Sequence, residues 1–239
     1  MPKHLLMLLL TVALAQAPLA LAADLQPFTL NYKASYGSFD AAAVRSLSPQ
    51  PASNSWEMRS KVEVKLLGST LVSVEESSTF NWKNELAVPS KYEYVQKGLN
   101  KRQRKLEFAA NGQSASYTIN DKSGVLTLMP PVFDNLTSGL MLRKHVLNGE
   151  TDINLTVADK EEVSPQSYQV VGTETTVIPA GTFNTVHIKR IRDSDSKRTT
   201  DIWLAPDHDY VMVKLLQTEP DGNTISLQLK SGTIGGQSF

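Results

Sequence analysis

A two-residue alternation of apolar and polar side chains restricts the fold of this chain more than any other feature of its sequence. Between Trp56 and Leu66 every odd-numbered position carries a charge, and the even-numbered positions are apolar apart from Ser60. A β-strand directs successive side chains to opposite faces, so the pattern predicts strands with one buried and one solvated face. A helix would distribute the same charges around its whole circumference.

Further segments of strand character follow along the chain, separated by turn residues such as Asn111-Gly112 and Asp221-Gly222, and Gly37, Gly98, Gly124 and Gly181 are interpreted as further turns. Short connections between many strands favour an antiparallel meander over βαβ units. We expect a mainly β fold, either a curved sheet or a partly open barrel. The predicted strands are Phe28–Tyr36, Trp56–Leu66, Thr70–Trp82, Lys91–Lys97, Arg104–Ala109, Ala115–Asn120, Asp152–Ala158, Tyr168–Gly172, Phe183–Arg192, Arg198–Ala205, Val211–Thr218 and Thr224–Lys230.

One segment departs from the alternation and predicts a helix that covers part of the sheet. Within Asp134–Leu147 the apolar residues recur near helical spacing, Asp134 suits the N-cap, and Asn148-Gly149 suits the end. The segment from Pro49 to Ser55 is interpreted as a surface loop, and Asp24–Pro27 and Gly232–Phe239 as loose termini.

The first 22 residues are predicted to be a cleaved signal peptide. Lys3 gives a basic start, Leu5–Leu14 is an apolar run, and Ala20-Leu21-Ala22 is an A-x-A cleavage site. The alternative, a membrane anchor, is disfavoured because a spanning helix needs about 20 apolar residues. We therefore expect a periplasmic protein whose mature part, residues 23–239, is a single β-rich domain without a transmembrane segment.

The composition excludes several classes of function. The chain has no cysteine, which excludes disulfides, a thiol nucleophile and iron–sulfur clusters. Cleavage would remove Lys3 and leave 23 basic against 24 acidic residues, a balance that argues against nucleic-acid binding. We expect no cofactor.

Catalytic and metal-binding motifs are missing from the sequence. His145, His187 and His208 have no partner at metal-ligand spacing, and no nucleophile elbow or phosphate-binding loop occurs. No catalytic residue and no metal site is therefore predicted. A hydrolase built on two carboxylates distant in sequence stays open as a less favoured hypothesis.

Two basic groups were weighed as ligand-binding surfaces for anionic envelope components. Lys101, Arg102 and Arg104 are the candidates in the first group, which also contains Lys97 and Lys105. The second group spans residues 189–198. The favoured interpretation of both is a solvated outer face whose charges also protect strand edges from aggregation.

The C-terminal part carries a set of motifs that resemble a known family. These are Gly172, Glu174, Ile178–Phe183, Thr185, Ile188, Arg190, Ile202–Asp207, Tyr210-Val211, Glu219 and Asp221-Gly222, preceded by Asp134–Ser138 with Leu142-Arg143. Over about residues 134–229 the chain is similar to the bacterial exported family of the domain of unknown function 3108. The resemblance implies a periplasmic β-rich protein and supplies no catalytic residue.

Two residues within these motifs are further candidates for ligand binding. Trp203 is expected at the core or its rim. Arg190 shares a strand face with Val186 and Ile188 and is therefore expected to point inward. A buried arginine needs a partner, so a structural ion pair with Glu174 or Asp201 is favoured over a ligand site for Arg190.

These observations favour a non-enzymatic envelope protein that binds an apolar or amphipathic ligand, such as a lipid, on a curved sheet. The alternative is a protein-interaction or structural module of the cell envelope. The sequence does not identify the ligand or the protein partners.

Overall fold

One antiparallel sheet contains all the strands of the computed structural model, which describes residues 25–66 and 68–239. The predicted signal peptide, residues 1–22, lies outside the described residues. The strands are β1 (Phe28–Tyr36), β2 (Phe39–Gln50), β3 (Ser55–Leu66), β4 (Ser69–Lys83), β5 (Leu86–Gly98), β6 (Arg102–Phe108), β7 (Ser114–Ile119), β8 (Lys122–Thr127), β9 (Asp152–Asp159), β10 (Glu162–Ile178), β11 (Gly181–Ile191), β12 (Thr199–Ala205), β13 (Val211–Thr218), β14 (Thr224–Ile234) and β15 (Gln237–Ser238).

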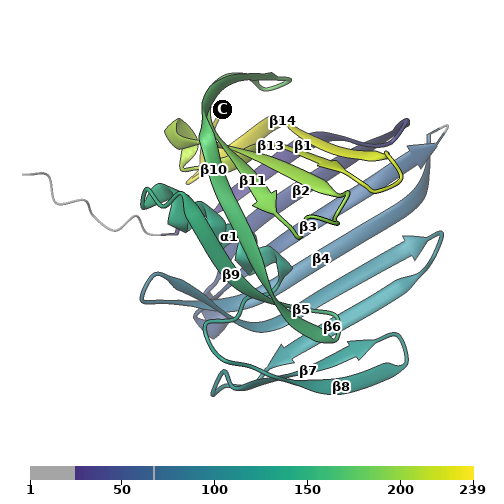
Figure 1. Ribbon diagram of the computed structural model, residues 1–239, viewed down its shortest axis with the longest axis vertical. Helices are drawn as coiled ribbons and strands as arrows, with labels where there is room; N and C mark the ends of the chain where they lie inside the picture. Colours follow the sequence, from purple (N-terminus) through teal and green to yellow (C-terminus); the bar gives the residue numbers. More distant parts are fainter. Residues whose placement is uncertain (1–24, 67) are drawn as a thin grey trace, which may run out of the picture.

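The order of the strands confirms the predicted antiparallel meander. It runs β8-β7-β6-β5-β4-β3-β2-β1-β14-β13-β12-β11-β10-β9, and β15 pairs with β14. Consecutive strands are neighbours except β8 and β9, and β1 pairs with both β2 and β14 and so joins the two halves of the chain. Strands β8 and β9 stand at opposite ends of this order and do not pair, so the curved sheet is open (Figure 1).

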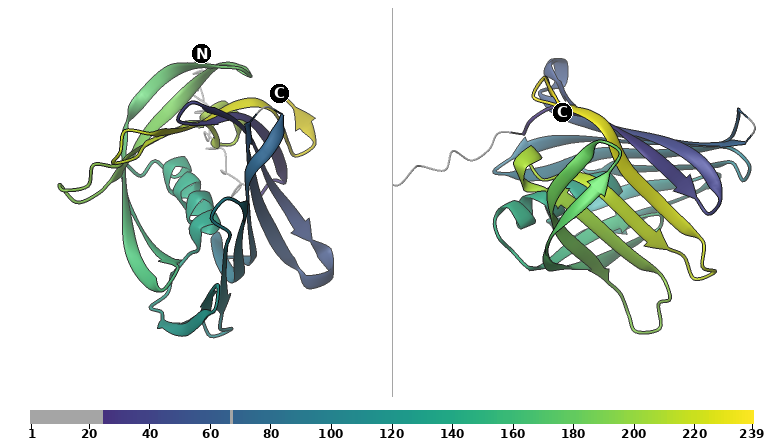
Figure 2. Two further views of the ribbon diagram at one scale, coloured as in Figure 1. Left: turned by 90° about the vertical axis from the view of Figure 1, so that its right-hand side faces the viewer. Right: turned by 90° about the horizontal axis from the view of Figure 1, so that it is seen from above.

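The sheet curls around the predicted helix, α1 (Asn135–Leu147) (Figure 2). The helix contacts β3, β4 and β5 on one wall and β9 on the other, so it covers the concave face near one end of the strands. Asp134 caps the helix as predicted. Its side chain accepts hydrogen bonds from the backbone N–H groups of Leu136 and Thr137 at 2.9 Å and from Ser78 Oγ at 2.6 Å.

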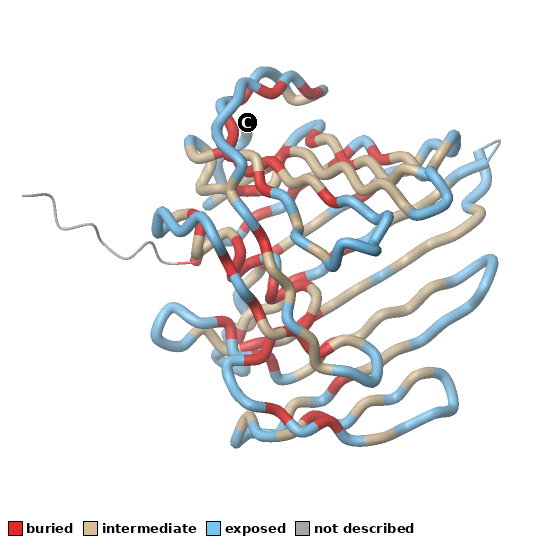
Figure 3. Tube along the Cα trace, in the orientation of Figure 1, coloured by how far each residue is buried: buried red, intermediate tan, exposed pale blue. Residues whose placement is uncertain are grey.

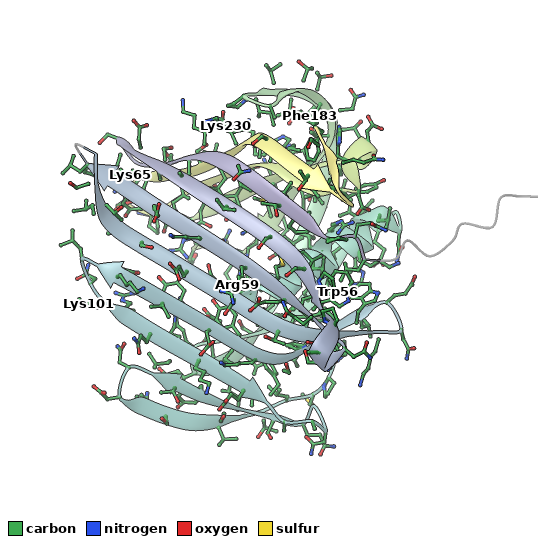
Figure 4. The ribbon with its side chains drawn as sticks, turned by 180° about the vertical axis from the view of Figure 1, so that it is seen from behind. Trp56, Arg59, Lys65, Lys101, Phe183 and Lys230 are labelled. Atoms are coloured by element: carbon green, nitrogen blue, oxygen red, sulfur yellow. The ribbon has the colours of Figure 1, made fainter. Side chains whose placement is uncertain are left out.

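The two faces of the sheet differ as the alternation predicts. On β3 and β4, Met58 and Ser78 pair across the strands and are buried on the concave face. The convex face carries the charged residues, including Arg59 and Lys65 (Figure 4). Neighbouring charges there form ion pairs, such as Arg59–Glu57 at 2.7 Å.

Burial along the concave face declines away from the helix. Figure 3 shows buried residues gathered near α1 and half-buried residues toward the other end of the strands. On β4, Phe80 and Ser78 are fully buried, whereas Glu76 and Val74 are half-buried. The inner surface is therefore packed at the helix end and accessible at the other end, which we call the mouth.

The structure corrects three expectations about local structure. Strand β2 (Phe39–Gln50) was not predicted, because its inward positions include the small Ala41 and Ala43 and the charged Arg45 instead of large apolar residues. Its C-terminal end shortens the predicted loop, which holds a short 3-10 helix, Pro51–Ser53. The predicted loose C-terminus is wrong, since β14 runs on to Ile234 and β15 pairs with it.

Gly124 is the third correction, because it lies inside the unpredicted strand β8 and not in a turn. It pairs with Tyr117 on β7, and a side chain at position 124 would meet the Tyr117 ring at about 2.5 Å. Glycine there leaves room for the Tyr117 ring, which a larger residue would displace, a reason that composition alone does not distinguish from a turn.

Candidate functional site

A cavity lies between α1 and the wall formed by β10–β13. It has a volume of about 220 Å³. Residues from both sides line it: Arg45, Asn135, Leu136, Ser138, Gly139, Leu142, Gln166, Tyr168, Arg190, Thr200, Ile202, Leu204, Met212, Leu215 and Gln217. Its walls thus mix apolar and polar residues on both sides, and two guanidinium groups reach it.

A second, smaller cavity of about 50 Å³ adjoins the first. Arg45, Gly139, Leu204 and Met212 line both cavities, so Arg45 stands at their common boundary. Position 139 is open on the helix surface, because an added Cβ would meet no atom within 4 Å. The absence of a side chain at Gly139 therefore leaves space in the site.

A row of polar side chains crosses the concave face of β2 to β6. Arg45, Ser60, Glu76, Tyr94 and Arg104 are cross-strand partners in that order, all on the inner side of the sheet. The row separates the packed region beneath α1 from the half-exposed mouth. We call it the polar row.

Much of the polar row is held by hydrogen bonds to its neighbours. Tyr92 Oη donates to Glu76 Oε2 at 2.5 Å. Arg104 lies 3.8 Å from the centre of the Tyr94 ring, and its Nη1 donates to Asp159 Oδ1 at 2.8 Å. These contacts neutralise Arg104 and fix it against the sheet.

Beyond the polar row, the mouth is lined mainly by half-buried apolar side chains. Val62 on β3 pairs with Val74 on β4, and Leu215 on β13 lies on the opposite wall. Val62 and Leu215 pack against the core while keeping part of their surface accessible, and Val74 is half-buried beside Val62. A concave surface of this kind can bury the apolar part of a ligand.

The candidates predicted from the first basic group do not form one surface. Arg104 points to the concave face, whereas its neighbour Lys105 points outward and pairs with Glu107 at 2.7 Å. Arg102 is exposed at the start of β6, and Lys101 is exposed in the turn before it. Alternation along the strand therefore divides the charges between two faces.

Arg190 points inward as predicted and lines the cavity. The expected ion pair with Glu174 or Asp201 is wrong. Those two carboxylates lie on the outer face, where Asp201 Oδ1 lies 2.8 Å from His187 Nε2 and Glu174 accepts a hydrogen bond from Trp203 Nε1. Side chains on opposite faces of a sheet cannot pair, and residue spacing did not reveal the face of each acid.

Trp203 is buried on the outer face and is not part of the cavity lining. Its ring stacks on that of His187 with 4.6 Å between centroids, and Lys214 Nζ lies 4.1 Å from the ring centre. His187, Trp203 and Lys214 are cross-strand neighbours on β11, β12 and β13. Both ring faces are thus covered, and the tryptophan serves to join three strands.

Sequence analysis did not identify Arg45 as a site residue. The available signal was its position two residues from both Ala43 and Leu47, which places a charge on an otherwise apolar face. Because Arg45 interrupts the apolar alternation, residues 39–50 were not predicted to form a strand.

Comparison with known proteins agrees with this architecture. The family described as "Protein of unknown function (DUF3108)" matches residues 31–230, so the match extends well beyond the C-terminal motifs. No curated protein sequence matches the chain. Within the described residues, no helix is long and apolar enough to span a membrane.

Comparison with solved structures found similar proteins, including the following two. The crystal structure of a beta-barrel-like protein of the domain of unknown function DUF1849 from Brucella abortus has 11% sequence identity and a TM-score of 0.59, covering 89% of this chain and 99% of that one. A Bacteroides fragilis protein with a YmcC-like fold has 10% identity and a TM-score of 0.37, covering 86% of this chain and 95% of that one. The Brucella protein thus shares the fold, at an identity too low to transfer a function.

Proposed function

Because the chain belongs to the DUF3108 family of proteins of unknown function, we propose its function from the geometry of the concave face. The protein is a non-enzymatic component of the bacterial envelope that binds an amphipathic ligand, such as a lipid. The observation that carries the proposal is the accessible apolar mouth, together with the cavity beneath α1, since Leu215 lines both.

The difference between the two faces of the sheet supports binding inside the curve. The convex face of β3 to β6 is covered by ion pairs such as Lys61–Glu63 at 2.9 Å and Lys91–Glu93 at 2.8 Å. The concave face of the same strands presents half-buried valines instead. Removing those apolar surfaces from water provides the driving force for a ligand with an apolar part.

The size of the cavity indicates how such a ligand would lie. A volume of about 220 Å³ is below the range of about 300–1,000 Å³ typical of pockets that enclose a whole drug-sized molecule. One end of an amphipathic molecule fits this space, and the remainder would lie along the open mouth.

The hydrogen bonds that two carboxylates near the cavity accept agree with a binding role. Glu76 accepts a hydrogen bond from Tyr92, and Asp159 accepts from Arg104 and from Asn135 Nδ2 at 3.1 Å. Each carboxylate is thus held by a structural partner, which favours binding over the hydrolase hypothesis. The division of Arg104 and Lys105 between two faces likewise favours ligand binding over an interaction module acting through that hairpin.

The proposed place of action is the periplasm. The basic start at Lys3, the apolar run Leu5–Leu14 and the A-x-A site ending at Ala22 support export through a cleaved signal peptide. Mass determination of the protein isolated from its native envelope tests this, since a mature chain that begins at residue 23 is expected.

Binding of a neutral apolar probe tests the proposed function. N-phenyl-1-naphthylamine fluoresces strongly in apolar surroundings, and we expect saturable fluorescence enhancement with the mature protein. Val74→Asn places a polar group in the mouth and is expected to weaken binding about tenfold. Val125→Asn is the matched control, because Val125 is 71% exposed on β8 and its variant should bind like the wild type.

Mass spectrometry of material extracted from natively isolated protein gives a second readout. Co-purification of a lipid in amounts approaching one per protein supports the proposal. Absence of any extracted lipid, together with probe fluorescence that Val74→Asn leaves unchanged, would refute it.

A further inference from the structure

Three arginines on the concave side lack the partners that half-buried charges normally have. Among the described residues, Arg45, Arg190 and Arg192 form no ion pair, whereas Arg104 pairs with Asp159 and Arg198 pairs with Glu219. The buried Nε atoms of Arg45 and Arg190 and the Nη1 atom of Arg192 also have no hydrogen-bond partner. The Nε atom of Arg104 lacks one as well, but its Nη1 donates to the carboxylate of Asp159, so within the part of the chain that the structure describes only the other three guanidinium groups have no anionic partner. A buried guanidinium group without an acceptor is costly.

The groups that contact Arg45 from neighbouring strands are neutral. Its strand neighbours on the concave face are Leu30 on β1 and Ser60 on β3, and its Nη1 lies 3.9 Å from the thioether sulfur of Met212. The nearest carboxylate in the polar row, Glu76, is engaged by Tyr92. A thioether is a weak acceptor, so the charge of Arg45 is not balanced by these contacts.

Arg190 and Arg192 place two further positive charges on the opposite wall. Arg192 Nη2 donates to Thr200 Oγ1 at 2.9 Å, a neutral acceptor that also lines the cavity. Burial lowers the pKa of Arg192 below its ordinary value, and the positive charges of Arg190 and Arg198 lower it further. The region thus favours an added negative charge.

The cavity brings these charges within reach of one ligand. Arg45 from β2 and Arg190 from β11 line the same space beneath α1, although they are 145 residues apart in the chain. Apolar side chains, among them Leu142 and Leu204, complete the walls. Guanidinium groups bind carboxylates and phosphates through paired hydrogen bonds, and a partly dry site strengthens such bonds.

We infer that Arg45 and Arg190 bind the anionic head of the ligand, a carboxylate or a phosphate, inside the cavity, while its apolar chain lies along the mouth. The inference rests on the proposed function and adds the orientation and the charge of the ligand. Arg192 stands beside this site and contributes to the positive potential without lining the cavity.

Calorimetric titration of the mature protein with ligands that share one chain length tests the inference. The probes are dodecanoate, dodecyl phosphate and neutral monododecanoylglycerol, all below their micelle concentrations, with inorganic phosphate as a fourth. We expect both anionic amphiphiles to bind about tenfold or more tightly than the neutral one. Inorganic phosphate should bind far more weakly than dodecyl phosphate, because it lacks the apolar chain.

Variants at the two arginines give the second arm of the test. Arg45→Gln and Arg190→Gln are each expected to weaken binding of the anionic probes about tenfold while leaving the neutral probe unchanged. Binding of the neutral probe also shows that each variant is folded. Lys189→Gln is the matched control, because Lys189 neighbours Arg190 on β11 but faces outward.

The possible results separate the two proposals. Equal affinity for charged and neutral amphiphiles, unaffected by either arginine substitution, overturns the inference and leaves the proposed function standing. Binding of inorganic phosphate as tight as that of dodecyl phosphate overturns the amphipathic ligand but supports an anion site. Absence of binding by all four probes overturns both.

Discussion

The helix end and the mouth of the concave face are built from the same strands but differ in what covers them. On β4, Phe80 is fully buried close to α1, and Val74, six residues earlier on the same face, is half-buried in the mouth. One helix cannot cover a sheet of this extent. The comparison suggests that the helix end supplies stability, whereas the mouth retains apolar surface for binding.

The largest expected effect tests this division directly. Phe80→Ala removes a fully buried ring beside the helix and should lower the free energy of unfolding by about 3–5 kcal/mol. Val62→Ala in the mouth should lower it by less than about 1 kcal/mol, because the side chain is only half-buried. Urea denaturation measures both values, with the same dependence of unfolding free energy on urea concentration assumed for the two variants. Similar losses of stability in the two variants would show that the mouth is part of the packed core.

The second prediction concerns the cap that fixes the helix to the sheet. Burial raises the pKa of Asp134 from 3.8 to about 6, despite hydrogen bonds from Ser78 and the helix backbone that favour the charged form. The folded state therefore holds a proton that the unfolded state releases between about pH 4 and pH 6. The contribution of this group to stability is full below that window and is lost as pH rises through it, by up to about 3 kcal/mol.

Asp134→Asn isolates this contribution, because asparagine is also a favourable N-cap and does not titrate. As pH rises from about 4 to about 7, the unfolding free energy of the wild type should fall relative to that of the variant. Equilibrium denaturation at a series of pH values measures it. A difference that stays constant with pH would place the pKa of Asp134 near its ordinary value.

The packed region around the helix is also predicted better from the sequence than the strands that carry the site. Strand β1 matches the predicted Phe28–Tyr36, and α1 begins after the predicted cap Asp134, because both regions are packed and keep a regular apolar pattern. Strand β2 was missed where Arg45 interrupts that pattern. Strand β10 (Glu162–Ile178) was predicted only over Tyr168–Gly172, because polar Gln166 lies on its inner face.

The candidate site was therefore predictable only in part. The inward direction of Arg190 follows from strand alternation and is confirmed. Its missing partner could not be derived, because a partner depends on which distant strand lies opposite. Two of the segments that sequence analysis missed, β2 and the first half of β10, place Arg45 and Gln166 in the site, as is expected where binding requires polar groups in place of core residues.

The smallest expected effect compares a paired with an unpaired arginine. Arg104→Met removes the partner of Asp159 and the contact with Tyr94, so the variant should lose about 1–2 kcal/mol of stability. Arg190→Met removes a guanidinium that forms no ion pair among the described residues and replaces it with an apolar side chain of similar length. We expect no loss, or a gain of up to about 1 kcal/mol, in the ligand-free protein. Urea denaturation of delipidated samples measures both. A loss in Arg190→Met as large as that in Arg104→Met would show that Arg190 stabilises the fold, and the presence of its charge inside the sheet would then not require an anionic ligand.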